Sequence, residues 1–227
     1  MPAASEKQLD ALGRYALKLV KPGQVLGLGT GRAASAFIKA LGESGVKVRG
    51  VPTSNGSAEL GRSVGIEVVE LSDVARIDID FDGADEVDSR LNLIKGYGGA
   101  LVREKIVVAS SRRFVVLVGE EKVVPRLGTR GSLPVEIVPF ALPLVTRAVK
   151  SLGLKALLRE KDGQTFRTDN GNFILDCKLK PIANAAKLDR DLLAIPGVVG
   201  TGIFIGMSDI VLIANADGTI KTLRPKS

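Results

Sequence analysis

The stretch "QVLGLGTGRAAS", residues 24–35, decides the fold class. A short apolar run turns through three glycines and enters a segment with the apolar spacing of a helix. A strand, a glycine turn and a helix in this order begin an open α/β sheet. The free N–H groups and the dipole at the start of such a helix favour an anion.

The same turn does not match a nucleotide-binding motif. A dinucleotide fingerprint needs a third glycine at position 32, which is Arg32, and an acidic residue after the next strand, where the chain has "VPTSN". A P-loop lysine is also missing after the glycines. The turn therefore predicts a site for a simple phosphate, with a tight turn that binds no ligand as the alternative.

The alternation of strands and helices predicts two domains. In the first half, strands at 24–29, 46–52, 77–81 and 114–119 alternate with helices at 32–43, 56–64 and 99–109, which is typical of a doubly wound, mostly parallel, Rossmann-like sheet. From residue 135 the order is strand, helix, strand, strand, helix, strand, as in a ferredoxin-like α+β unit. The Gly- and Pro-containing segment 126–134 separates the two patterns, and 209–223 reads as a strand and hairpin that rejoin the first domain. We expect a catalytic domain of residues 1–128 and 203–227 and a ferredoxin-like domain of residues 129–202.

Composition limits the function classes. The net charge of +7 suits an anionic partner, but aromatic residues make up only 4% of the chain and tryptophan is absent, so we expect a small phosphorylated molecule and no nucleic acid. No apolar run approaches the roughly 18 residues of a membrane span. Histidine is absent, which excludes a histidine-ligated metal. The single cysteine, Cys177, lies in an apolar stretch, and we expect it to pack in the core. Because one cysteine cannot form an internal disulfide and no apolar leader segment is present, we expect a cytoplasmic protein.

The stretch "DFDGADEVD", residues 80–88, is a candidate binding site because its carboxylates repel one another. Such crowding costs stability unless the carboxylates bind hydroxyls, cations or a metal such as Mg²⁺. A solvated acidic loop is the alternative. The acidic residues are Asp80, Asp82, Asp85, Glu86 and Asp88.

The stretch "LIKGYGGALVREK", residues 93–105, contains a candidate general base. On a helix from about residue 99 to 109, the neighbours of Glu104 three and four positions away are all apolar: Ala100, Leu101, Val107 and Val108. Burial among them should raise the pKa of Glu104, as a base working near neutral pH requires. The alternative is that Glu104, Arg103 and Lys105 form internal ion pairs.

Proton transfer next to a carbonyl needs a carboxylate base, acidic residues that bind sugar hydroxyls and a site for phosphate, and the stretches above supply candidates for each. A resemblance to a known family supports this interpretation. The segments "GLGTG", "VPTS", "DFDGADEVD", "LIKGYGGALVREKIV", "LPVEIVPF", "TDNGNFILDC", "IPGVV" and "DGTIKTL" closely resemble the type-A family of ribose-5-phosphate isomerase, nearly end to end. The resemblance implies an aldose–ketose isomerase that interconverts ribose 5-phosphate and ribulose 5-phosphate through an enediolate, in the non-oxidative pentose phosphate pathway. It also implies no metal or other cofactor, and a homodimer or homotetramer.

The resemblance also implies roles for individual residues. Glu104 matches the base that moves the proton between C1 and C2, and Lys95 matches the cation beside the reacting oxygens. Asp82 and Asp85 match the acids that hold substrate hydroxyls and assist ring opening. The substrate-binding positions that it implies are Thr30, Gly31, Arg32, Ala33, Gly83, Ala84, Gly96, Tyr97, Gly98 and Lys122.

The chain departs from the family pattern near the phosphate. After "GTG" the family usually has Ser-Thr, where this chain has Arg32 and Ala33. The Arg32 guanidinium is a candidate replacement for the missing hydroxyls, with a solvent-facing arginine as the alternative. A phosphate-binding lysine of the family's first helix aligns with Leu9, with Lys7 nearby. Tyr97 stands at a position that varies in the family, which gives it no catalytic role.

Two other functions remain open from the residues. One is a sugar-phosphate sensor that binds without turnover, although the first sheet strand begins near residue 24 and leaves little room for a preceding helix-turn-helix. The other is an isomerase of a different phosphorylated aldose.

Overall fold

A seven-stranded sheet forms the centre of the first of two units in the computed structural model, which describes residues 2–225. This first unit comprises the described parts of residues 1–84, 103–123 and 206–227. The strand order is β16-β15-β7-β4-β1-β2-β3, and all neighbouring pairs are parallel except the β15–β16 hairpin. The strands are β1 (Val25–Leu28), β2 (Arg49–Pro52), β3 (Glu67–Val68), β4 (Ile79–Gly83), β7 (Phe114–Gly119), β15 (Ile210–Ala214) and β16 (Ile220–Leu223). The expected parallel sheet is confirmed, including the return of residues 209–223 to it.

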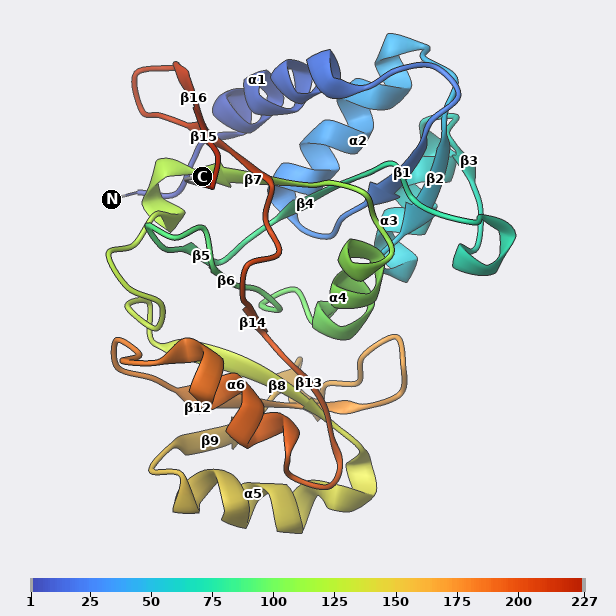
Figure 1. Ribbon diagram of the computed structural model, residues 1–227. Helices are drawn as coiled ribbons and strands as arrows, with labels where there is room; N and C mark the ends of the chain where they lie inside the picture. Colours follow the sequence, from blue (N-terminus) through green and yellow to red (C-terminus); the bar gives the residue numbers. More distant parts are fainter. Residues whose placement is uncertain (1, 226–227) are drawn as a thin grey trace. The chain divides into compact units, whose positions relative to one another are not determined.

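The two faces of this sheet are covered by different helices (Figure 1). Helices α1 (Glu6–Ala16), α2 (Arg32–Ser44) and α3 (Asn55–Ser63) pack on one face, where Leu26 and Leu28 join the main core. Helix α4 (Leu101–Ala109) covers the other face through Val107, which meets Val25. Because side chains alternate along a strand, Asp80 and Asp82 on β4 lie on the α4 side, opposite Phe81 in the main core.

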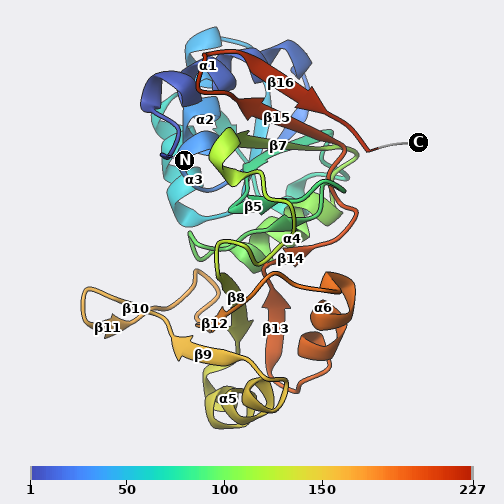
Figure 2. The same ribbon diagram turned by 90° about the vertical axis from the view of Figure 1, so that its left-hand side faces the viewer.

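The second unit contains an antiparallel four-stranded sheet of order β13-β8-β12-β9 (Figure 2). Helices α5 (Leu142–Ser151) and α6 (Ala185–Leu193) share one core with one face of this sheet. The chain order and strand order are those of a ferredoxin-like unit, as the sequence predicts. The strands are β8 (Ser132–Ile137), β9 (Lys155–Leu158), β12 (Phe173–Lys178) and β13 (Val198–Thr201), with a small hairpin of β10 (Glu160–Lys161) and β11 (Gln164–Thr165).

The boundary between the units differs from the sequence expectation. The second unit comprises residues 85–102 and 124–205, so residues 85–102, 124–128 and 203–205 join it and not the Rossmann-like unit. The reason is a three-stranded sheet of β5 (Glu86–Val87), β6 (Leu93–Ile94) and β14 (Ile203–Phe204). Strands of two residues show no periodicity in the sequence, so this sheet was not foreseen.

Short 3-10 helices complete the fold: η1 (Leu17–Leu19), η2 (Leu71–Asp73), η3 (Glu120–Lys122) and η4 (Pro139–Ala141).

Helix α4 begins two residues later than expected. The reason is a turn in which Gly99 has a φ of 86° and its N–H donates to the Gly96 carbonyl at 3.0 Å. Among residues 2–225, no helix is both long and apolar enough to cross a membrane.

Candidate active site

The glycine turn after β1 holds the carboxylate of Asp82. Asp82 Oδ1 accepts hydrogen bonds from the Thr30 N–H at 2.9 Å and from the Gly83 N–H at 2.7 Å. A Cβ on Gly29 would lie 2.6 Å from the Asp82 Cα and still closer to its carboxyl group. Gly29 is therefore required because Asp82 fills the space beside it, and one N–H of the predicted anion site is used by the chain itself.

A cluster of hydroxyl groups lies beside the same turn, and the sequence reasoning missed it. Thr30 Oγ1 lies 2.8 Å from Thr53 Oγ1 and 2.8 Å from Ser54 Oγ. Ser54 also caps α3 by accepting the Ser57 N–H at 3.1 Å. The sequence signal for these hydroxyls is the "VPTS" segment after the second strand, at the place where a dinucleotide fingerprint would have an acidic residue. The hydroxyl protons are used within the chain: Thr53 Oγ1 donates to the Leu28 carbonyl at 3.1 Å, and Ser54 Oγ donates to Ser57 Oγ at 3.2 Å.

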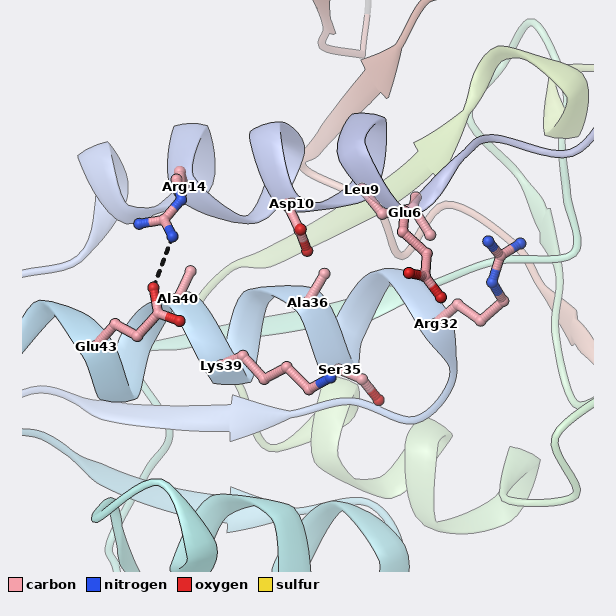
Figure 3. A pocket seen from close by; sticks show the side chains of 10 residues that line it. All are labelled: Glu6, Leu9, Asp10, Arg14, Arg32, Ser35, Ala36, Lys39, Ala40 and Glu43. Carbon is pink, nitrogen blue, oxygen red and sulfur yellow. Dashed lines mark hydrogen bonds and ion pairs between the residues drawn. The ribbon is translucent and has the colours of Figure 1, made fainter.

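Arg32 and Ala33 begin α2 in the positions where the family pattern has hydroxyls. Arg32 is exposed, and its Nη2 donates to the Ala4 carbonyl at 3.0 Å. It lines a cavity of about 390 Å³ between α1 and α2, and Figure 3 shows Arg32 at one end and the Arg14–Glu43 ion pair at the other. Leu9, at the aligned lysine position, is buried in the main core.

The acidic stretch does not act as one cluster, because two of its members hold turns. Buried Glu86 accepts the N–H groups of Gly128 and Arg130, both at 2.6 Å, and desolvation raises its pKa although these bonds oppose the shift. Asp88 Oδ1 accepts the Asn92 N–H at 2.9 Å and closes the β5–β6 hairpin. Within residues 2–225, no group of three or more Cys, Asp or Glu side chains is arranged to hold a metal ion.

Glu104 lies in the first turn of α4 and is only 3% exposed. The four apolar neighbours predicted from helical spacing are all buried: Ala100, Leu101, Val107 and Val108. Arg103, next to it in sequence, extends toward α3 and donates to Asn55 Oδ1 at 3.3 Å. The predicted burial of Glu104 is confirmed, while its apolar surroundings and its role as a base stay predictions.

In the second unit, Lys95 directly follows β6 and is 2% exposed. Its N–H donates to the Gly202 carbonyl at 2.8 Å, and its Nζ lies 5.8 Å from the centre of the Phe204 ring. Gly96, the next residue, has a φ of 104°, a conformation that favours glycine. Lys95 is thus buried, with its ammonium group near an aromatic ring, at the start of a glycine loop.

Asp85 contacts the same loop through the backbone of Tyr97. Its Oδ2 accepts the Tyr97 N–H at 2.9 Å, and its own N–H donates to the Ile94 carbonyl at 2.8 Å. The Tyr97 hydroxyl donates to the Ser132 carbonyl at 3.3 Å, and burial together with the charges of Asp85 and Glu86 raises the Tyr97 pKa to about 12. The phenol therefore stays protonated at neutral pH.

Comparison with known proteins agrees with the sequence resemblance. The sequence model described as "Ribose 5-phosphate isomerase A (phosphoriboisomerase A)" matches residues 49–218. The chain belongs to this family. Curated ribose-5-phosphate isomerases A from Gloeobacter violaceus and Roseiflexus sp. (strain RS-1) are 44% and 45% identical to it, over 94% of this chain and 94% of each relative.

Solved structures of ribose 5-phosphate isomerases share the fold. The enzyme from Methanocaldococcus jannaschii superposes with a TM-score of 0.90 at 42% identity, covering 97% of this chain and all of the other. A D-ribose-5-phosphate isomerase in complex with phospho-erythronic acid gives a TM-score of 0.93 at 38% identity, covering 99% of this chain and all of the other.

The residues expected from the isomerase family divide between the two units. The first unit holds Thr30, Gly31, Arg32, Ala33, Asp82, Gly83, Ala84, Glu104 and Lys122. The second unit holds Asp85, Lys95, Gly96, Tyr97 and Gly98. Within the first unit, hydrogen bonds join Thr30 and Gly83 to Asp82, and within the second unit one joins Tyr97 to Asp85. Lys122 ends η3 after β7 and is half-buried.

Proposed function

We propose that this chain, as a member of the ribose 5-phosphate isomerase A family, interconverts ribose 5-phosphate and ribulose 5-phosphate through an enediolate. The observation that carries the proposal is the burial of Glu104, which is 3% exposed, in the "REK" segment of the family pattern. A carboxylate in such a place is poorly solvated and so is a stronger base than one in water.

In the proposed reaction, Glu104 removes the proton from C2 of the open-chain aldose and returns it to C1. The electron pair of the C2–H bond forms the C1–C2 double bond, and negative charge develops on the oxygen of the former carbonyl. As the double-bond pair takes the returned proton at C1, the C2 hydroxyl loses its proton to form the C2 carbonyl, and the C1 oxygen gains one. Lys95 stabilises that charge, because a buried ammonium acts more strongly on a nearby oxyanion than one in water. Asp82 and Asp85 hold the sugar hydroxyls and assist ring opening.

We assign the phosphate to the start of α2 and the loops around it. Thr30, Gly31, Arg32 and Ala33 form the turn and the first helical residues, where N–H groups and the helix dipole favour an anion. The N-terminus of α2 supports this assignment, because its N-cap is Gly31 and no side chain caps its first N–H groups. Gly83, Ala84, Gly96, Tyr97, Gly98 and Lys122 are proposed as the remaining substrate contacts.

We further propose that the protein works in the cytoplasm as a homodimer or homotetramer. Large apolar side chains left exposed on the second unit support self-association: Phe140 is 95% exposed, Leu157 51% and Leu144 44%. Light scattering of the purified protein measures the subunit number directly, and a monomer at assay concentration contradicts this part of the proposal.

The test of the function replaces the proposed base. Glu104→Gln keeps the size of the side chain and should lower kcat by about 10² to 10⁴, with substrate binding nearly unchanged. Glu59→Gln, at an exposed position on α3, is the matched control and should keep the wild-type kcat. Thermal denaturation of the same preparations separates loss of the base from loss of a buried ion pair, which would cost about 3 to 5 kcal/mol of stability.

Two results contradict the proposal. Exchange of the substrate's C2 hydrogen with solvent at the wild-type rate in Glu104→Gln would remove Glu104 as the base. A wild-type protein that binds ribose 5-phosphate without converting it would be a sensor, and a panel of other phosphorylated aldoses tests for an isomerase of different specificity.

A further inference from the structure

The side chain of Arg159 joins the ferredoxin-like sheet to the loop after Lys95. Its Nε and Nη2 donate to the two carboxylate oxygens of Asp176 at 2.8 and 2.5 Å. Its Nη1 donates to the carbonyls of Gly96 and Tyr97 at 2.9 and 3.1 Å. The Arg159 side chain is 14% exposed, and its three guanidinium nitrogens all donate hydrogen bonds, which fixes the orientation of the group.

A second contact from the same segment limits the loop at its far end. The Phe166 N–H donates to the Arg159 carbonyl at 2.9 Å, and the guanidinium carbon lies 5.9 Å from the centre of the Phe166 ring. A Cβ on Gly99 would lie 2.5 Å from the Phe166 Cζ. The glycine loop 96–99 is therefore held by Arg159 at its beginning and by Phe166 at its end.

This support lies directly beside two residues with proposed roles in the reaction. Lys95 precedes Gly96, whose carbonyl accepts a hydrogen bond from Arg159. Asp85 accepts the N–H of Tyr97, and the Tyr97 carbonyl also accepts a hydrogen bond from Arg159. The loop contains three glycines in four positions, and such a segment has a large conformational freedom unless its backbone groups are bonded. The hydrogen bonds from Arg159 to the Gly96 and Tyr97 carbonyls restrict the backbone next to Lys95, and so limit movement of the Lys95 side chain.

We propose that Arg159, oriented by Asp176, is a positioning residue of the isomerase: it fixes the Gly96 and Tyr97 carbonyls and thereby the placement of Lys95 and Asp85. Arg159 itself touches no reacting atom in this proposal. The inference rests on the proposed function of Lys95 and Asp85.

The chain offers a matched control in Arg167. Its Nη1 donates to the Gly171 carbonyl at 3.1 Å, and its guanidinium carbon lies 4.8 Å from the centre of the Phe173 ring. It shares with Arg159 a carbonyl bond and a ring contact in the same unit, but it is exposed and contacts a different loop. Arg167→Ala therefore reports the effect of losing such contacts away from the Lys95 loop.

The experiment compares Arg159→Ala, Arg159→Lys and Arg167→Ala by two readouts. Hydrogen exchange of the peptide covering residues 95–101 reports the loop without reference to catalysis, and the Tyr97 and Gly99 amides are bonded in the wild type. We expect faster exchange there in Arg159→Ala and wild-type exchange in Arg167→Ala. We also expect kcat of Arg159→Ala to fall on the order of 10- to 100-fold with a much smaller change in KM, because an ångström of misplacement costs about that much.

Added guanidinium ion at a non-denaturing concentration should restore part of the kcat of Arg159→Ala and leave Arg167→Ala unchanged. If Arg159→Ala does not fold, Arg159→Lys serves instead: it keeps the charge beside Asp176 but lacks the planar fork, and the same loss of kcat is expected.

Wild-type kcat in a folded Arg159 variant, or an equal loss in Arg167→Ala, overturns the inference. Unchanged exchange of residues 95–101 in folded Arg159→Ala also overturns it. Absence of isomerase activity in the wild type would instead contradict the proposed function, and the exchange readout still reports whether Arg159 holds the loop.

Discussion

Replacing Gly29 by alanine tests whether the glycine turn exists to make room for Asp82. The added Cβ would lie 2.6 Å from the Asp82 Cα, whereas carbon atoms in contact prefer about 3.5 to 4.0 Å. The gap is short by about an ångström, and because the Asp82 Cα is a backbone atom, a change of rotamer cannot relieve it. Strand β4 or the turn must therefore move apart.

The close contact in Gly29→Ala should lower both the stability and the activity of the protein. Overpacking of this kind costs about 1 to 3 kcal/mol of unfolding free energy. An ångström of displacement at a residue that holds substrate lowers the rate by about 10²-fold. We therefore expect Gly29→Ala to be folded, with a lower Tm and a kcat/KM reduced by about two orders of magnitude.

The assay is ribose 5-phosphate isomerisation together with thermal denaturation of the same samples. Gly56→Ala is the control, because the nearest atom to its added Cβ is Ser54 Oγ at 3.9 Å and the site lies in α3, where alanine stabilises by about 0.5 to 1 kcal/mol. Wild-type stability and activity in Gly29→Ala would refute the packing argument. A loss of activity that follows only the unfolded fraction would refute its catalytic part.

Three further predictions concern the phosphate, a metal and the thiol. Arg32→Ala should chiefly raise KM for the phosphorylated sugar, with a smaller effect on kcat, and an unchanged KM would make Arg32 a surface residue. Steady-state activity should survive excess EDTA, whereas loss that Mg²⁺ restores would reveal a metal site. Cys177 is buried, and desolvation first and the Asp176 charge second raise its pKa to about 12, so iodoacetamide should label it at pH 8 only after the protein is unfolded. Because the folded pKa lies above the ordinary 9.0, the stability that this thiol contributes should be lost as pH rises from about 9 toward 12.

The sequence predicted the long elements because their patterns are local. The apolar run of β7 and the helical spacing around Glu104 identify a buried strand and a buried helix without any distant partner. The three-stranded sheet of β5, β6 and β14 could not be predicted, because strands of two residues depend on pairing across the chain and not on their own periodicity.

Residue type indicates candidate site positions in the sequence, but contacts between distant segments decide which groups each of these side chains bonds. Neighbouring acids such as Asp82 and Glu86 look equivalent in sequence, but one lies at the glycine turn and the other holds the loop at Gly128. Gly29 reads as part of an anion site, and only the approach of β4 shows that a carboxylate of the chain occupies the space. The hydrogen bond from Arg159 to the Gly96 carbonyl likewise joins segments that are more than sixty residues apart.

The position of β15 in the sheet has a consequence for synthesis on the ribosome. This strand pairs in parallel with β7, yet the ribosome makes it only after the whole of the ferredoxin-like unit, since residues 124–205 intervene. Until then, β7 has an open edge that can pair with other nascent chains. The ferredoxin-like unit is complete in sequence earlier and can fold first, so the Rossmann-like unit should be the later and slower part to fold.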